Sequence, residues 1–177
     1  FSLQQYYRDI RISALYEGTT GIQSQDLLGR KVPMQNGKGL ELLSAEIVKT
    51  IISATIDDDL KLYGTILGDK LKQSQKILGH LMPFAMKGNY ERYLADANLF
   101  MEYMSIVVLG WLWLEMAVDA KKQINNADKK YSETFYESKI HTMKFYFKYE
   151  VPKTNSLVES LMNNEVLTIK TDKELIL

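Results

Sequence analysis

Proline is almost absent from this chain, and its scarcity constrains the fold more than any other feature of the sequence. Only three prolines occur in 177 residues, at positions 33, 83 and 152. Proline breaks helices by removing a backbone donor, and the long stretches between these positions are rich in Leu, Met, Lys, Glu and Ala, which favour helix. The sequence therefore predicts an all-α fold, a bundle of about four to five main helices.

The first forty residues contain two short predicted helices and a linker. Apolar residues recur in a loose helical rhythm over residues 4–15, and Gly18 followed by Thr19 and Thr20 is typical of one helix ending and the next being capped. The second helix is expected over residues 21–30. Residues 32–39 hold one proline and two glycines, which is the composition of a linker.

This linker divides the chain into four predicted parts. They are residues 1–32, a linker at 33–39, a helical bundle at 40–165 and a tail at 166–177, whose first residues carry only a weak strand signal.

The bundle is predicted to contain four main helices and a short fifth. Leu40, Leu43, Ile47 and Ile51 mark the first helix by their three to four residue spacing. The aspartates at 57–59 are expected to cap the second helix. The remaining segments are a helix over about 90–125 that is apolar on most sides, an aromatic-rich helix over about 130–149 and a short helix over 156–162.

Composition excludes several classes of function. Lys plus Arg equals Asp plus Glu at 22 each, so no net field draws the chain to nucleic acid or to an anionic membrane surface. The apolar run at 104–114 is shorter than the roughly 20 residues of a membrane span. There is no cysteine, which excludes disulfides and thiolate chemistry and fits a cytoplasmic setting. Because the chain starts at Phe1 within a helical pattern, we expect its N-terminus to be a cut.

Residues 7–23 are the most informative stretch for function. Glu17 stands at a predicted helix end, directly before Gly18 and two threonines, Thr19 and Thr20, that can cap the next helix. A carboxylate at such a corner can face a cleft, and the next helix start offers free backbone N–H groups. A plain corner with an exposed glutamate explains the same spacing, since Gly-Thr-Thr is common turn and cap chemistry.

The run Tyr-Glu-Gly-Thr-Thr-Gly-Ile-Gln at 16–23, preceded by Arg-Asp-Ile-Arg-Ile at 8–12, resembles the end of the catalytic C-terminal helical domain of acyl-CoA dehydrogenases. The resemblance implies that Glu17 is the base that removes the α-proton of an acyl-CoA while a hydride passes from the β-carbon to FAD. It also implies that Gly18 and Thr19 line the flavin side of the turn. Residues 1–32 would then close the catalytic domain, and the bundle would be the additional helical domain of an extended subgroup.

The resemblance also sets expectations for cofactor and partners. The parent enzyme would use FAD, act on an acyl-CoA and pass electrons to an electron-transfer flavoprotein, and we expect a homo-oligomer, a dimer. The present fragment is expected neither to bind FAD tightly nor to turn over alone. Two alternatives stay open, namely an acyl-CoA oxidase and a non-catalytic helical module for oligomerisation or docking.

Other chemical motifs in the sequence are weak. His80 and His141 lie far apart without ligand spacing, so no metal site is expected. The Gly-Lys-Gly at 37–39 lacks the length of a phosphate-binding loop. Arg8, Asp9 and Arg11 are expected to form an ion-pair cluster that orients the first helix.

Overall fold

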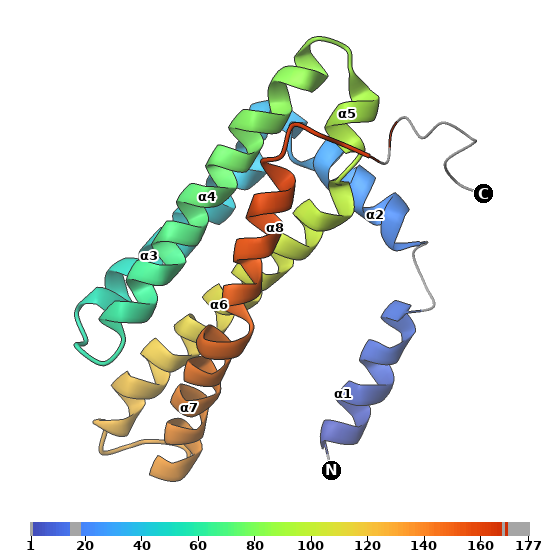
Figure 1. The fold of residues 1–177 in the computed structure, drawn as a ribbon. Helices are drawn as coiled ribbons and strands as arrows, with labels where there is room; N and C mark the ends of the chain where they lie inside the picture. The colour runs from blue at the N-terminus through green and yellow to red at the C-terminus, as the bar shows by residue number, and fades with distance from the viewer. Residues whose placement is uncertain (1, 15–18, 168, 170–177) are drawn as a thin grey trace.

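The structure is a computed structural model that describes residues 2–14, 19–167 and 169. Within these residues every regular element is a helix, which confirms the predicted all-α class (Figure 1). The α-helices are α1 (Ser2–Arg11), α2 (Thr20–Asp26), α3 (Lys38–Thr55), α4 (Lys61–Met86), α5 (Tyr90–Leu94), α6 (Ala97–Ile124), α7 (Glu133–Tyr149) and α8 (Thr154–Leu161). The short 3-10 and π segments are η1 (Ile12–Ala14), η2 (Leu27–Lys31), η3 (Met34–Gly37) and η4 (Val151–Lys153).

Helix α6 occupies the centre of the bundle and contacts α2, α3, α4, α7 and α8. Its side chains Phe100, Tyr103 and Leu114 are completely buried. A helix surrounded by others has no broad polar face, which explains why this segment is apolar on most sides. Around it, α3 and α4 form one antiparallel pair and α6 and α7 another, while α8 runs back along α6 (Figure 1).

The apolar run at 104–114 belongs to a longer apolar helical stretch, so its short length does not exclude a membrane span. With its flanking residues, the helical stretch Tyr90–Ile124 is long and apolar enough to cross a membrane by length and composition alone. In the structure, 39% of its apolar window is buried inside the bundle. The contacts of α6 with five other helices bury part of this apolar surface inside the bundle.

Two helix starts differ from the sequence-based prediction. The aspartates at 57–59 do not cap α4, whose first flanking residue is Leu60; Asp57 instead accepts a hydrogen bond from the backbone of Asp59 (2.9 Å), and Asp59 pairs with Lys121 on α6. The helix expected over 90–125 is broken before Ala97, so that α5 and α6 are separate. The side chain of Asn89 caps α5 by accepting from the backbone N of Arg92 (3.1 Å).

Segment α2–η2 packs onto the end of the bundle. Leu28 is fully buried, and its carbonyl accepts a hydrogen bond from the hydroxyl of Tyr93 (2.6 Å). Ser24 is also buried and hydrogen-bonds the side chain of Asn98 on α6. The domain boundary at residues 33–39 stays a prediction, but α2 and η2, which precede it, share a buried interface with α5 and α6.

The predicted linker is a tight left-handed turn. Gln35, Asn36 and Gly37 have φ angles of 51°, 57° and 80°. Left-handed backbone costs an L-residue about 1–2 kcal/mol, and only glycine adopts it freely. Helix α3 starts immediately afterwards, and Gly39 lies in its first turn, where an added Cβ would meet nothing within 4 Å.

Two alanine substitutions in this turn should have opposite signs. Gly37→Ala forces a side chain into a left-handed conformation and should lower the free energy of unfolding by about 1 kcal/mol. Gly39→Ala removes a glycine from a helix where a methyl group has room, and should raise it by about 0.5 kcal/mol. Urea unfolding followed by circular dichroism measures both, and an equal loss at the two positions would contradict the left-handed turn.

The anchoring of α2–η2 can be tested at Leu28. Leu28→Ala removes a fully buried side chain and should lower the free energy of unfolding by about 3 kcal/mol, with faster hydrogen exchange in α2. The matched control is Leu42→Ala on α3, where the leucine is 57% exposed and the change should stay within about 0.5 kcal/mol. Equal losses for the two variants would show that α2–η2 does not pack as described.

Candidate functional site

Of the three residues that the sequence assigns to a catalytic turn, the structure describes one. Glu17 and Gly18 lie outside the described residues, so their positions as base and as flavin neighbour stay predictions. Thr19 is described and is exposed. The described part of the predicted site thus consists of Thr19 and the helix that follows it.

Thr19 is the N-cap of α2, and it is one of the two threonines at which the sequence predicts a cap. Its backbone is extended (φ −75°, ψ 154°), and its Oγ1 accepts a long hydrogen bond from the backbone N of Ile22 (3.5 Å). The Thr19 carbonyl accepts from the backbone N of Gln23 (3.1 Å). At Gly21 an added Cβ would meet nothing within 4 Å, so the outer side of this turn is open.

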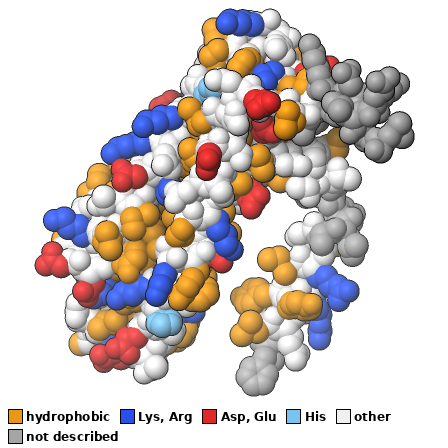
Figure 2. Space-filling view, in the orientation of Figure 1, with side chains coloured by type: hydrophobic (Ala, Val, Ile, Leu, Met, Phe, Trp, Pro, Cys, Tyr) orange, Lys and Arg blue, Asp and Glu red, His pale blue; other side chains and the backbone are white. Residues whose placement is uncertain are grey.

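Helix α1, on the other side of the predicted turn, presents an uncovered apolar face. Leu3, Tyr6, Tyr7 and Ile10 follow helical spacing and are 66–76% exposed. The helix lies apart from the bundle in Figure 1, and its hydrophobic side chains form a surface patch in Figure 2. An amphipathic helix gains most of its stability by burying such a face. We therefore expect α1 to pack against protein outside this chain.

The described residues of α1 do not form the predicted ion-pair cluster. Asp9 accepts a hydrogen bond from the side chain of Gln5 one turn earlier (2.8 Å). Among the described residues, no ion pair within 4.0 Å joins Asp9 to Arg8 or Arg11. The amide is one helical turn away from the carboxylate, which favours this pairing over the predicted one.

The described part of the chain holds no group of three or more His, Asp or Glu side chains that could bind a metal ion. His80 lies on α4, with its ring edge against Phe84 at 5.8 Å between centroids. His141 lies on α7, beside a surface hollow that Asp57 and Lys121 also line. The two histidines are thus on separate parts of the bundle.

Buried polar groups in the bundle core act as structural ties. The ammonium of Lys70 on α4 donates to the side chain of Asn155 on α8 (2.7 Å), and burial lowers the pKa of this lysine. The hydroxyl of Tyr103 donates to the Lys70 carbonyl (2.6 Å), and its burial raises the pKa of Tyr103. Burial raises the pKa of Tyr146 to about 12. None of these groups is placed to exchange a proton with a ligand at the Thr19 turn, because they link helices inside the bundle.

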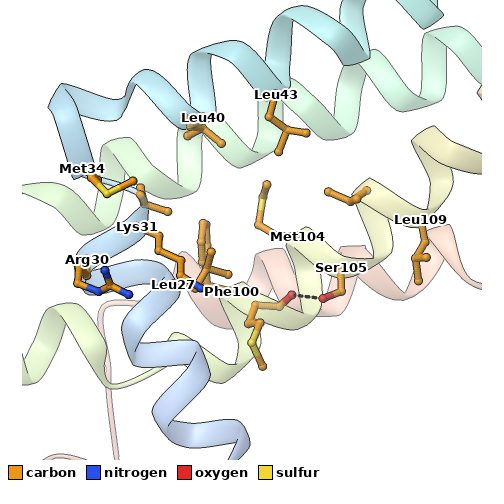
Figure 3. A pocket seen from close by; sticks show the side chains of 14 residues that line it. Leu27, Arg30, Lys31, Met34, Leu40, Leu43, Phe100, Met104, Ser105 and Leu109 are labelled. Atoms are coloured by element: carbon orange, nitrogen blue, oxygen red, sulfur yellow. Dashed lines mark hydrogen bonds between the residues drawn. The ribbon is translucent and has the colours of Figure 1, made fainter. Parts of the chain in front are cut away.

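An apolar groove of about 700 Å³ lies between η2, η3, α3 and α6 (Figure 3). Its walls carry aliphatic, aromatic and methionine side chains, including Leu27, Met34, Leu40, Leu43, Phe100, Met104 and Leu109. Arg30 and Lys31 lie at one end of it. Both cations contact Asp26, whose pKa is lowered chiefly by its hydrogen bond from Arg30.

Sequence reasoning missed this groove. Leu40 and Leu43 belong to the stripe that periodicity assigned to the bundle core, and in the structure they are only partly buried. Periodicity marks an apolar helix face but does not tell whether another element covers it. The π-helical segment η2, which brings Leu27 and Arg30 to the groove, has no sequence signal of its own.

The sequence comparisons agree with this architecture. Residues 43–172 match the family model described as "Acetyl-CoA dehydrogenase C-terminal like". The chain is 28% identical over 173 residues to the broad-specificity linear acyl-CoA dehydrogenase of Mycobacterium tuberculosis, covering 93% of this chain and 28% of that protein. It is 28% identical over 158 residues to a butyryl-CoA dehydrogenase of Syntrophomonas wolfei, covering 82% of this chain and 24% of that protein.

A third relative matches over a shorter stretch. The 3-methylmercaptopropionyl-CoA dehydrogenase of Ruegeria pomeroyi is 50% identical over 46 residues, which are 26% of this chain and 8% of that protein. The chain spans about a quarter of the length of the first two relatives. Because the family model matches well over half of its residues, the chain belongs to the acyl-CoA dehydrogenase family, in the C-terminal region of those enzymes.

Proposed function

We propose that this chain is the C-terminal part of a flavin-dependent enzyme that oxidises a saturated acyl-CoA to its trans-2-enoyl-CoA. The observation that carries the proposal is the run at residues 16–23, whose second half forms a Thr19-capped helix anchored to the bundle, in a chain of this family. The relatives are named as acyl-CoA dehydrogenases, which supports the reaction class. Acyl chain length and branching are left open by this proposal.

Glu17 is the proposed general base. The α-proton of a thioester is weakly acidic, so its removal needs a carboxylate within hydrogen-bond reach and desolvated enough to raise its pKa. The proton passes to the Glu17 carboxylate, and hydrogen bonds to the thioester carbonyl stabilise the developing enolate. The N-cap of α2, which follows Glu17 by two residues in the sequence, begins the α2–η2 segment that Leu28 and Ser24 anchor to the bundle.

FAD would supply the acceptor for the β-hydride. Gly18 and Thr19 are the proposed flavin neighbours in this chain. Thr19 fits this role because it is exposed, and within the part of the chain that the structure describes its hydroxyl oxygen accepts one long capping bond of 3.5 Å. This turn is a small part of a cofactor site, so the rest of the contacts would come from the regions that the longer relatives possess in addition.

The proposed partners follow from the same reaction. An electron-transfer flavoprotein would reoxidise the flavin, and the enzyme would be a cytoplasmic homo-oligomer, a dimer. An acyl-CoA oxidase is the competing enzyme, and it would pass electrons to oxygen instead. The competing non-enzymatic function is a docking module, which the exposed apolar face of α1 and the apolar groove favour.

Anaerobic flavin bleaching of the full-length parent enzyme by a panel of saturated acyl-CoAs tests the proposal. Wild-type enzyme should bleach, and Glu17→Gln should bleach about 100 to 10,000 times more slowly, which is the usual contribution of a general base. Glu41→Gln is the matched control, since Glu41 is an exposed carboxylate paired with Lys38, and it should bleach like the wild type. Equal bleaching by the Glu17 variant would place the base elsewhere.

Reoxidation of the bleached enzyme separates the two enzyme classes. A dehydrogenase should reoxidise slowly in air and quickly with electron-transfer flavoprotein, whereas rapid reoxidation by oxygen alone would identify an oxidase.

The isolated 177-residue chain should retain no FAD after gel filtration, because only Gly18 and Thr19 of its residues are assigned to the cofactor. The flavin absorbance of the eluted protein measures this. A stoichiometric flavin peak that coelutes with the chain would contradict the assignment of the cofactor site to a longer protein.

A further inference from the structure

The apolar groove continues into an uncovered face of α6. From Leu109, which lines the groove, a stripe continues along α6 through Leu112 and Met116. These residues are spaced by three to four positions and are 38–48% exposed. Helical side chains at this spacing lie on one face. We call the groove together with this stripe the α6 groove. An apolar helix face that continues from a groove in this way can form a contact surface for protein or ligand.

The polar groups of the α6 groove are few and lie at one end. Ser105 donates its hydroxyl to the Met101 carbonyl of its own helix (2.8 Å), so it adds no free donor (Figure 3). Arg30 and Lys31 share the single carboxylate of Asp26, which leaves one net positive charge at that end. The occupant should therefore be apolar along its length and carry a carboxylate at one end.

Two observations indicate where this occupant comes from. The interface between α2–η2 and the bundle runs directly into the groove, because Leu27, Arg30 and Lys31 of η2 line it. The segment before the linker therefore already covers one end of this surface. In addition, the relatives are about four times as long as this chain, so most of their residues are available to cover the remainder.

We propose that the α6 groove receives an amphipathic helix from the catalytic region of the same polypeptide, with an acidic side chain near Arg30 and Lys31. This inference rests on the proposed function, which places the chain in a longer dehydrogenase. A helix of three turns is about 16 Å long, and the α6 residues from Phe100 to Leu109 that line the groove extend over about 14 Å at the same rise per residue. The docked helix fixes the bundle against the catalytic region and so holds the α2 start in place.

Single cysteines test this docking, since the chain contains none of its own. Leu109→Cys places a thiol in the groove, and Leu112→Cys places a second one on the same face. Lys72→Cys is the control on the charged surface of α4, where the lysine side chain is 74% exposed. Maleimide labelling rates are measured by peptide mass spectrometry in the isolated chain and in the full-length parent, with folding of each variant checked by circular dichroism.

All three thiols should label quickly in the isolated chain. In the parent, labelling at positions 109 and 112 should slow on the order of 100-fold, whereas position 72 keeps its rate. Rapid labelling at 109 and 112 in the parent would overturn the proposal. Protection in the isolated chain that grows with its concentration would show a second copy as the occupant, and protection there by laurate would show a fatty acyl ligand; either result also overturns it.

The same parent sample separates this inference from the proposed function. Flavin bleaching by acyl-CoA together with fast labelling at position 109 would contradict the docked helix but would support the proposed enzyme activity. Slow labelling at position 109 without flavin bleaching would support the docked helix and would contradict the proposed oxidation of acyl-CoA.

Discussion

Burial of α6 against five other helices is the contact on which the structure depends. Each fully buried large side chain, such as Phe100 or Leu114, contributes about 2 kcal/mol through removal of apolar surface from water. Polar ties across the same helix fix its rotation, since Trp111 donates to Thr50 on α3 (2.8 Å) and Tyr146 on α7 donates to the Ile106 carbonyl (3.2 Å). The position of α2 follows from this central packing, because α2 contacts α6.

Helix α2 follows the predicted catalytic turn in the sequence and leads directly into η2. Its N-terminus carries Thr19 and the predicted catalytic turn, and the segment η2 at its other end buries Leu28 in the bundle. Helix α2 and the segment η2 thus join Thr19 to the packed core of the bundle.

The sequence was sufficient to predict the class and most of the helices, because proline scarcity and apolar periodicity act locally. A cap at one of the two threonines, Thr19 or Thr20, was predicted from the same local rules, and the structure has it at Thr19. Gly88, which follows α4, has a left-handed φ of 76°, as is common at helix ends. The break before Ala97 and the pairing of Asp59 with Lys121 depend on tertiary contacts, which a single sequence does not display.

Part of the candidate site was predicted from the sequence, and part became visible only in the structure. Glu17 was identified by resemblance of residues 16–23 to a family motif, and Thr19 is the one of the two predicted capping threonines that caps α2. The α6 groove had no such signal, because its leucines and methionines have the same spacing whether they face a core or an open surface. The structure distinguishes the two by exposure, with Leu109 left 48% exposed.

The central claim is that Glu17 removes an α-proton, and solvent isotope exchange tests it without hydride transfer. Acetyl-CoA has an α-carbon and no β-carbon, so in D₂O the full-length parent can exchange its α-protons but cannot oxidise it. The account predicts that deuterium enters the α-position at a rate that falls about 100-fold or more in Glu17→Gln. Equal deuterium incorporation by the wild type and this variant would contradict it.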